Sequence, residues 1–260
     1  MADIGTSDER DISGRVVIIT GGGQGIGRQY ALSFAQAGAI PVIADINTQN
    51  AQRVEREVSE AGGQGHALEV DVGGPESCIA MARQVEEKYG RIDVLINNAA
   101  LFSSLSKHAF DEIPLGVWND VMNVNVSGPF HCARAVVPIM RKAGWGRVIN
   151  ISSSSVALGN VNYLHYVTPK SAMLGMTNAL AREVGKSGIT VNCITPSATT
   201  TEVEREGFTD ETAKRVAANQ CIPNPATPGD LIGLAMFLAS PASAFVTGQT
   251  IAANGGLTHG

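Results

Sequence analysis

The stretch VVIITGGGQGIG, residues 16–27, decides the fold that we expect for this chain. Its first four residues are a short β-branched run, which is typical of a buried strand, and a helix is expected from Gln24 to Ala37. Glycines between a strand and a helix let the backbone turn tightly and approach a pyrophosphate, which the free N–H groups of the helix bind. Gly21, Gly25 and Gly27 therefore predict a dinucleotide-binding turn, with a purely structural turn as the alternative.

Outward from this stretch, apolar runs alternate with amphipathic stretches. We expect strands at 16–19, 40–44, 66–70, 94–96, 147–151, 189–194 and 250–253. We expect helices at 24–37, 50–61, 76–89, 118–140 (one or two), 166–185 and 230–239. This alternation predicts an α/β fold, a Rossmann-like doubly wound parallel sheet of about seven strands with helices on both faces. Residues 1–260 form one domain in this interpretation, and residues 199–228, where charge, Pro and Thr cluster, form a substrate lid.

The composition narrows the class of protein. The 260 residues include 29 glycines, are 44% hydrophobic and carry a net charge of −5, which argues against disorder and against a nucleic-acid partner. Residues 231–260 hold no Asp, Glu, Lys or Arg, but Ser240-Pro241 interrupts them, so a subunit contact is expected rather than a membrane span. Asp3, Asp8 and Glu9 are not typical of a secretory signal. Four scattered cysteines fit a cytoplasmic protein, and no metal-ligand spacing is present.

Asp45 ends the second expected strand and indicates which dinucleotide binds. A carboxylate at this position accepts hydrogen bonds from the adenosine ribose hydroxyls and repels a 2′-phosphate. Gln24 brings no positive charge that would attract that phosphate. We therefore expect NAD rather than NADP as the cofactor, and the alternative is that Asp45 is a surface residue at a strand end.

A second motif, Tyr166-Val-Thr-Pro-Lys170, places a phenol and an amine on one face of a helix. The ammonium of Lys170 and the positive nicotinamide ring of an oxidised cofactor are together expected to favour the phenolate and to lower the pKa of Tyr166, which could then exchange a proton with an alcohol. Proline fits the first turn of a helix, so Pro169 indicates a helix that begins close to Tyr166. Ser153 follows the fifth strand and could hold the substrate oxygen, although its serine neighbours leave the assignment open by one residue.

These motifs together resemble the short-chain dehydrogenase/reductase family, over nearly the whole chain from about Gly14 to Gly256. Other positions match the family pattern too: Asp71-Val72, Asn97-Asn98-Ala99-Ala100, Asn125 and Pro196 with the residues after it. Within the family, the sequence is most similar to bacterial 1-phenylethanol dehydrogenase and related NAD-dependent secondary alcohol dehydrogenases. The resemblance also implies a homotetramer, in which the uncharged C-terminal region makes the subunit contacts.

The resemblance implies roles for the matching residues. The catalytic set is Asn125, Ser153, Tyr166 and Lys170, in which Asn125 binds backbone and a water that extends a proton relay from Lys170. The cofactor-binding set is Gly21, Gln24, Gly25, Ile26, Gly27, Asp45, Ile46, Asp71, Val72, Asn98, Ala99, Ala100, Tyr166, Lys170, Pro196, Thr199 and Thr201. Four residues depart from the family pattern: Ala100, Ser197, Thr199 and Asn254. The departures at Ala100 and Thr199 leave the nicotinamide contacts open.

The function expected from these features is NAD-dependent hydride transfer between a nicotinamide and a secondary alcohol or ketone. The substrate is expected to be a small, largely apolar molecule, because the candidate wall residues carry no charge: Leu101, Phe102, Val156 and Leu158. One alternative is a 3-oxoacyl-thioester ketoreductase, for which a basic patch would bind the carrier protein: Arg134, Arg141, Lys142 and Arg147. An alternative of another class is a catalytically silent nucleotide sensor.

Overall fold

The computed structural model describes residues 10–259, so Asp3, Asp8 and Glu9 lie outside the described residues. Its strands are β1 (Val16–Thr20), β2 (Ile40–Asp45), β3 (His66–Glu69), β4 (Val94–Asn97), β5 (Gly146–Ile151), β6 (Ile189–Pro196) and β7 (Thr250–Ala253). They form one sheet in the order β3-β2-β1-β4-β5-β6-β7, and every neighbouring pair is parallel. The Rossmann-like sheet expected from the sequence is confirmed.

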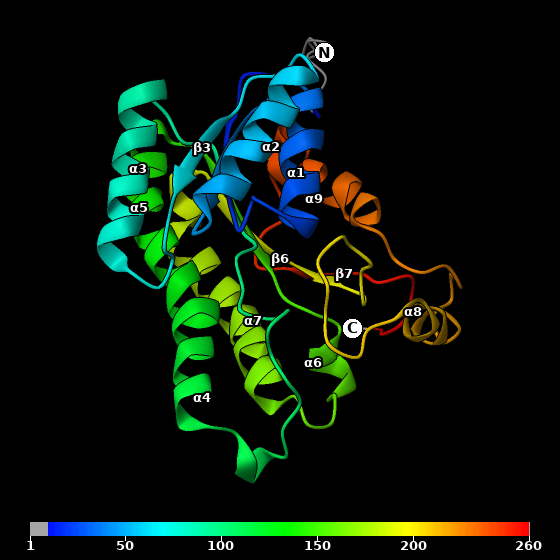
Figure 1. Cartoon of the computed structure of the whole chain (residues 1–260). Coiled ribbons are helices and arrows are strands. Elements are labelled where there is room, and N and C mark those ends of the chain that lie inside the picture. Colours follow the sequence, from blue (N-terminus) through cyan, green and yellow to red (C-terminus); the bar gives the residue numbers. More distant parts are fainter. Residues whose placement is uncertain (1–9, 260) are drawn as a thin grey trace.

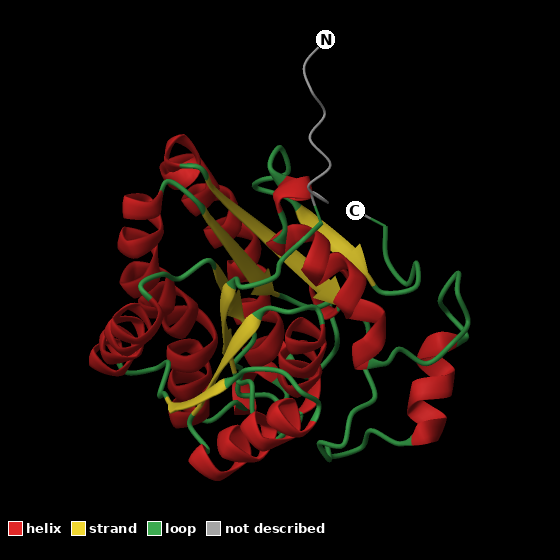
Figure 2. Ribbon diagram, turned by 90° about the horizontal axis from the view of Figure 1, so that it is seen from above, coloured by secondary structure: helices red, strands yellow, loops and turns green. Residues whose placement is uncertain are grey.

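The helices cover both faces of this sheet (Figures 1 and 2). They are α1 (Gly25–Gln36), α2 (Thr48–Glu60), α3 (Pro75–Tyr89), α4 (Leu115–Met122), α5 (Gly128–Ala143), α6 (Ser155–Leu158), α7 (Leu164–Val184), α8 (Asp210–Ala217) and α9 (Ile232–Ala239). One apolar cluster joins the sheet to α3, α5 and α7, and a second joins it to α1, α2 and α9. The connections between parallel strands require these crossover helices.

Burial on both faces explains why the strands are continuous apolar runs in the sequence. Successive side chains of a strand point to opposite faces. Val16 and Ile18 belong to the cluster with α3 and α5, whereas Val17 and Ile19 belong to the cluster with α1 and α2. Because neither face meets water, neither set of alternate positions is polar.

The stretch 118–140, for which one or two helices were expected, holds two, α4 and α5, joined by a π-helical turn over Asn123–Ser127. Two local features differ from the sequence prediction. Helix α7 begins at Leu164, close to Tyr166 as expected, but Pro169 is its sixth residue and not part of its first turn. Helices α6 and α8 were not predicted, because each is short and α8 lies within the expected lid.

Residues 199–228 leave the regular alternation of strand and helix, as expected. They connect β6 to the 3₁₀ turn at Pro228–Leu231 and contain α8, which lies at the edge of the molecule in Figure 1. Among the described residues, no helix combines the length and the apolar character that a membrane crossing needs.

Candidate active site

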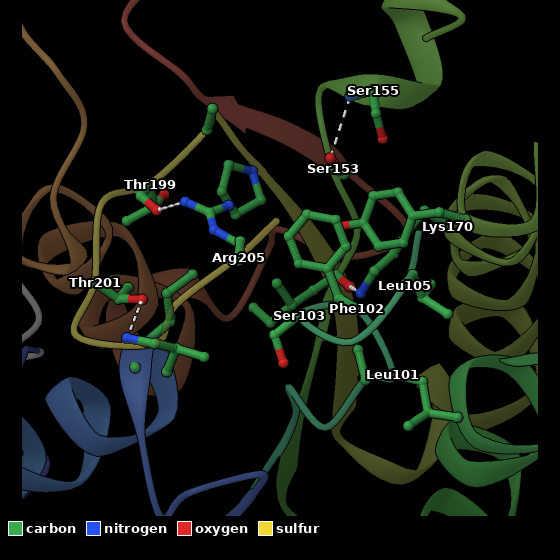
Figure 3. A pocket seen from close by; sticks show the side chains of 18 of the residues that line it. Leu101, Phe102, Ser103, Leu105, Ser153, Ser155, Lys170, Thr199, Thr201 and Arg205 are labelled. Carbon is green, nitrogen blue, oxygen red and sulfur yellow. Dashed lines mark hydrogen bonds between the residues drawn. The ribbon is translucent and has the colours of Figure 1, made fainter. Parts of the chain in front are cut away.

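A cavity of about 760 Å³ opens at the carboxyl ends of the strands, where parallel α/β sheets bind ligands (Figure 3). It extends from Asp45 and Ile46, past the glycine loop, to Tyr166 and Lys170. All the site residues predicted from the sequence line it except Gly27 and Asn125. The topology therefore brings together motifs that lie on β1, β2, β4, β5, β6 and α7.

The glycine loop is packed directly against the end of β4. Gly21 has a φ of +61°, and a Cβ atom there would lie 2.8 Å from the Cα of Ala99. The side-chain amide of Asn98 donates to the carbonyls of Thr20 and Gly21, at 3.0 and 3.1 Å. The Thr20 hydroxyl in turn accepts from the backbone N–H groups of Asn98 and Ala99. These contacts fix the turn in the cavity floor before any ligand binds.

Gly27 acts through packing and not as part of the cavity wall. A Cβ atom at Gly27 would overlap the carbonyl oxygen of Gly21, so only glycine lets α1 approach the turn this closely. Gly25, in contrast, lines the cavity, and its backbone N–H donates to a carboxylate oxygen of Glu202 at 3.0 Å. An acidic oxygen thus already lies at the start of α1, where unpaired N–H groups and the helix dipole favour anions.

Asp45 is held at the opposite end of the cavity by backbone donors. Its carboxylate accepts from the N–H groups of Gly23 and Asn47, both at 2.9 Å. The neighbouring Ile46 is 69% exposed and presents an apolar surface beside it. At the next strand along, Asp71 accepts from the backbone N–H of Gly73. The carboxylate of Asp45 is therefore oriented but not neutralised by a cation.

Tyr166 lies at the far end of the cavity, where it is 8% exposed. Ser153 lies at the same end of the cavity as its phenol, and the ring of Phe102 stacks on its ring with centroids 4.3 Å apart. Burial raises the pKa of Tyr166 to about 12, and Ser153 and the charge of Arg205 oppose that rise. The lowered pKa expected from the sequence depends on Lys170 and on the positive nicotinamide ring of the oxidised cofactor together, so it stays a prediction for the cofactor-bound enzyme.

Lys170 is 5% exposed, and its ammonium nitrogen lies 5.9 Å from the centroid of the Tyr166 ring. The ammonium donates to the carbonyl of Ile151 at 2.8 Å. Burial lowers the pKa of Lys170 to about 8. The ammonium thus lies on the Tyr166 side of the cavity, and its burial brings its pKa closer to neutral.

Asn125 lies in the π-helical turn between α4 and α5, behind the cavity wall. Its side chain accepts from the N–H of Leu101 at 2.8 Å and donates to the carbonyl of Leu101 at 3.1 Å. This double hydrogen bond fixes the chain that carries Phe102 onto Tyr166. Inserted turns of this kind are frequent at functional sites.

Three predicted residues lie at and after the end of β6, on the other side of the cavity: Pro196 is the last residue of the strand, and Thr199 and Thr201 follow it. The carbonyl of Pro196 accepts from the N–H of Ser154, and the Thr199 hydroxyl donates to the carbonyl of Ser197. The Thr201 hydroxyl accepts from the N–H of Val203. The chain thereby turns back over the cavity toward the glycine loop.

The sequence analysis missed the charges that this returning segment brings. Arg205 lines the cavity and donates from Nη2 to the carbonyl of Thr199 at 2.6 Å, as Figure 3 shows. Of the expected wall residues, Leu101, Phe102 and Leu158 line the cavity, but Val156 does not. The expectation of an uncharged pocket is therefore wrong. The clustered charges of residues 202–206 were a signal, but sequence spacing does not tell where a loop side chain points.

The donors and acceptors of the cavity fit a nicotinamide dinucleotide. The start of α1 offers an N–H that already binds a carboxylate oxygen, which is the chemistry a pyrophosphate needs. Asp45 offers carboxylate oxygens to ribose hydroxyls, and Lys170 offers an ammonium at the other end. We therefore name the glycine loop, Asp45 and Lys170 as the groups that would hold this cofactor.

Comparison with known proteins agrees with the geometry. A family model described as "Enoyl-(Acyl carrier protein) reductase" matches residues 21–258. The chain is 33% identical to 7alpha-hydroxysteroid dehydrogenase of Escherichia coli over 96% of both chains. It is 36% identical to (2S)-[(R)-hydroxy(phenyl)methyl]succinyl-CoA dehydrogenase subunit BbsD of Thauera aromatica, over 94% of this chain and 97% of that one. It is 33% identical to 3-oxoacyl-[acyl-carrier-protein] reductase FabG of Pseudomonas aeruginosa, over 95% of this chain and 98% of that one.

Solved structures are similar over the same length. A 7 alpha-hydroxysteroid dehydrogenase complexed with NADH and 7-oxo glycochenodeoxycholic acid has a TM-score of 0.88 and 32% identity, over 95% of both chains. An NAD(P)-dependent gluconate 5-dehydrogenase from Beutenbergia cavernae, described as putative and with bound NADP, has a TM-score of 0.87 and 32% identity, over 96% of this chain and 98% of that one. The two neighbours thus carry different nicotinamide dinucleotides.

Proposed function

The chain belongs to the short-chain dehydrogenase/reductase family, and from that premise we propose that it is an NAD-dependent oxidoreductase that interconverts a secondary alcohol and a ketone. The observation that carries the proposal is one continuous cavity with Asp45 at one end and Ser153, Tyr166 and Lys170 at the other. Its two ends match the two parts of the reaction, cofactor binding and proton transfer.

Tyr166 exchanges the proton in this proposal. When bound, the nicotinamide accepts or donates the hydride. Oxidation of the alcohol breaks its C–H bond, whose hydride leaves with the cofactor, and its O–H bond, whose proton passes to Tyr166; reduction reverses both. Ser153 holds the substrate oxygen against the phenol, since both side chains line the same end of the cavity. Positioned proton transfer of this kind typically contributes about 10²–10⁴-fold to the rate.

Lys170 and Asn125 support this proton transfer. The Lys170 ammonium lies beside the Tyr166 ring and favours the phenolate when the proton has left. Asn125 keeps Leu101 in place, and through it Phe102 on the Tyr166 ring. With both Tyr166 and Lys170 in place, catalysis is favoured over the silent nucleotide sensor.

The preference for NAD rests on Asp45. Its carboxylate is fixed by two backbone N–H groups and has no cation within ion-pair distance among residues 10–259, so a 2′-phosphate beside it would be repelled. Ile46, Asp71 and Val72 would border the adenine on the same side. Thr199 and Thr201 would meet the nicotinamide carboxamide at the other end.

The substrate that we propose is a secondary alcohol or ketone whose reacting carbon lies beside an aromatic or other apolar group, as in 1-phenylethanol. Phe102, Leu105 and Leu158 offer such a wall. The ketoreductase alternative has a relative in its favour, but its expected basic patch is incomplete. Arg147 is 2% exposed and donates to the carbonyls of Gly146 and Ser240, so it cannot meet a carrier protein.

We further propose a cytoplasmic homotetramer. The uncharged C-terminal region leaves Phe245 fully exposed and Phe237 partly exposed in the single chain. Apolar side chains on one surface are typical of a subunit contact. A monomer in light scattering at working concentration would contradict this assembly.

A panel of alcohols and ketones with NAD and NADP, followed by the absorbance of the reduced nicotinamide, tests the proposal. We expect turnover of 1-phenylethanol-like alcohols and a preference for NAD.

Asp45→Ala should lower the NAD preference by roughly 10-fold or more, because a charge-assisted hydrogen bond is worth about 1.5–3 kcal/mol. Glu69→Ala, which removes a carboxylate that binds Thr48, is the matched control. An unchanged preference in Asp45→Ala would remove Asp45 from cofactor selection.

A further inference from the structure

Arg205 is a cation within the cavity wall, beside the reacting phenol. Its guanidinium carbon lies 3.8 Å from the centroid of the Phe208 ring and 5.5 Å from that of Phe102. Phe102 stacks in turn on Tyr166, and the charge of Arg205 acts on that phenol. In Figure 3, Arg205 lies on the Thr199 side of the cavity and Lys170 on the opposite side. A ligand oriented between them would meet Tyr166.

No carboxylate of residues 10–259 forms an ion pair with Arg205. Of the acidic residues close to it in sequence, Glu202 accepts from the N–H of Gly25 and Glu206 accepts from the hydroxyl of Ser106. Glu204 is exposed and forms no ion pair with Arg205. The Nε of Arg205 is buried and has no hydrogen-bond partner in the described chain. Burying a cation without an anion is costly, so retaining one in a catalytic cavity indicates an external anion.

Resting on the proposed function, we propose that Arg205 binds a carboxylate of the substrate, so that the enzyme acts on secondary alcohols or ketones that carry a carboxylate near the reacting carbon. The planar guanidinium matches a carboxylate with paired donors, and the ring of Phe208 holds its plane. Among the described residues, its one hydrogen-bond acceptor is the carbonyl of Thr199, which Nη2 contacts. Because Nε is buried, Nη1 and the second N–H of Nη2 are the donors left to a ligand.

The position of Arg205 favours a substrate anion over the cofactor phosphates. The backbone donor for a pyrophosphate is the N–H of Gly25, which is bonded to Glu202 and not to Arg205. Arg205 instead lies between Thr199 and the aromatic rings that border Tyr166. An aromatic group next to the reacting carbon would contact Phe102, while the carboxylate would point toward Arg205.

A matched pair of ketones that differ in one charge tests this assignment: benzoylformate and its ethyl ester, each reduced with NADH. The wild type should have the higher kcat/KM for the acid. Arg205→Met should lower the acid-to-ester ratio of kcat/KM by about 10- to 100-fold, mainly through KM for the acid. Arg205→Lys keeps the positive charge but loses the paired N–H donors of the guanidinium, so its acid-to-ester ratio of kcat/KM should lie between those of the wild type and Arg205→Met. Arg215→Met, an exposed arginine on α8, is the control and should keep the wild-type ratio.

Three results would overturn the assignment: no preference for the acid in the wild type, an equal loss for acid and ester in Arg205→Met, or a loss of NADH affinity large enough to explain the loss for the acid. The second result would mean that Arg205 acts on Tyr166 alone. If the wild type reduces neutral ketones but does not prefer the acid, only this assignment fails. If it turns over nothing, the proposed function fails.

Direct binding keeps the assignment testable without turnover. Benzoate and benzamide have the same shape and differ in charge. Calorimetry with the NADH-loaded protein should show tighter binding of benzoate in the wild type and no such difference in Arg205→Met. Equal binding of the two ligands by the wild type would contradict a carboxylate site, and thermal melting of each variant checks that it is folded.

Discussion

Two regions border the cavity and differ in how they are held. The glycine loop is tied to β4 by the Asn98 amide and the Thr20 hydroxyl, and the β2 end is tied to it by Asp45. The segment of residues 199–208 lies opposite. Two of its side chains tie it to the rest of the cavity, Glu202 to Gly25 and Glu206 to Ser106, and Arg205 binds the carbonyl of Thr199 within the segment.

We call the glycine loop and the β2 end the fixed region, and the segment of residues 199–208 the replaceable region. Contacts to backbone atoms within the sheet cannot change without disturbing the fold, so the first region binds a constant ligand well. Exposed carboxylates such as Glu202 and Glu206 exchange their partners at little cost, because exposed ion pairs and hydrogen bonds contribute at most about 1 kcal/mol each. We therefore expect substitutions in the fixed region to affect all substrates, and those in the 199–208 segment to affect particular ligands.

The largest effect is expected at Tyr166, where the two regions meet. Tyr166→Phe removes the hydroxyl that exchanges the proton and leaves the ring that stacks on Phe102. We expect kcat to fall by about 10³-fold, with NADH still bound. Steady-state rates and NADH fluorescence titration measure the two quantities. Full activity in this variant would show that another group transfers the proton.

Gly27 tests how rigid the glycine loop is. Gly27→Ala places a methyl group against the Gly21 carbonyl, and backbone cannot move aside as a flexible side chain can. We expect the free energy of unfolding to fall by about 2–3 kcal/mol and cofactor affinity to fall with it. Gly116→Ala, at a helical glycine with no atom within 4 Å of the added Cβ, is the control for urea unfolding. Equal stability of the two variants would show that the turn adapts.

The fixed region is also the part that could be predicted from sequence. Val16 to Gly27 and Asp45 lie in regular strands and in the turn that follows β1. The alternation of side chains along a strand, and the spacing of the glycines in the turn, determine where each residue lies. Arg205 and Glu202 could not be placed, because they follow β6 in an irregular segment whose path depends on contacts with distant residues. The raised pKa of Tyr166 could not be predicted either, since it arises from burial beneath Phe102, which no motif encodes.

The buried Lys170 predicts how stability depends on pH. Its pKa is about 8 in the folded protein and 10.5 in the unfolded chain, so between these values the unfolded chain binds more protons. The free energy of unfolding should therefore rise from pH 8 toward 10.5, by about 2 kcal/mol, relative to Lys170→Met. Urea unfolding of both proteins at pH 7, 8.5 and 9.5 measures the difference. Parallel curves would mean that Lys170 is not desolvated.

The smallest effect is expected at Glu202, and it probes the replaceable region. The carboxylate of Glu202 and a pyrophosphate would need the same N–H of Gly25, and two anions at one helix start repel each other. Glu202→Gln removes that repulsion and weakens the competing contact. We expect the NADH dissociation constant to decrease about 3- to 10-fold at low ionic strength, with less gain at high salt.

Glu204→Gln serves as the matched control for that measurement. Glu204 is exposed, carries the same charge in the same segment and makes no hydrogen bond or ion pair with any other residue of the described chain. Its neutralisation changes the overall field but not the contact with Gly25. If Glu202→Gln instead weakens NADH binding, Glu202 stabilises the segment over the bound cofactor. The contrast between the fixed and the replaceable region would then fail at the hydrogen bond between Gly25 and Glu202, which joins the two regions.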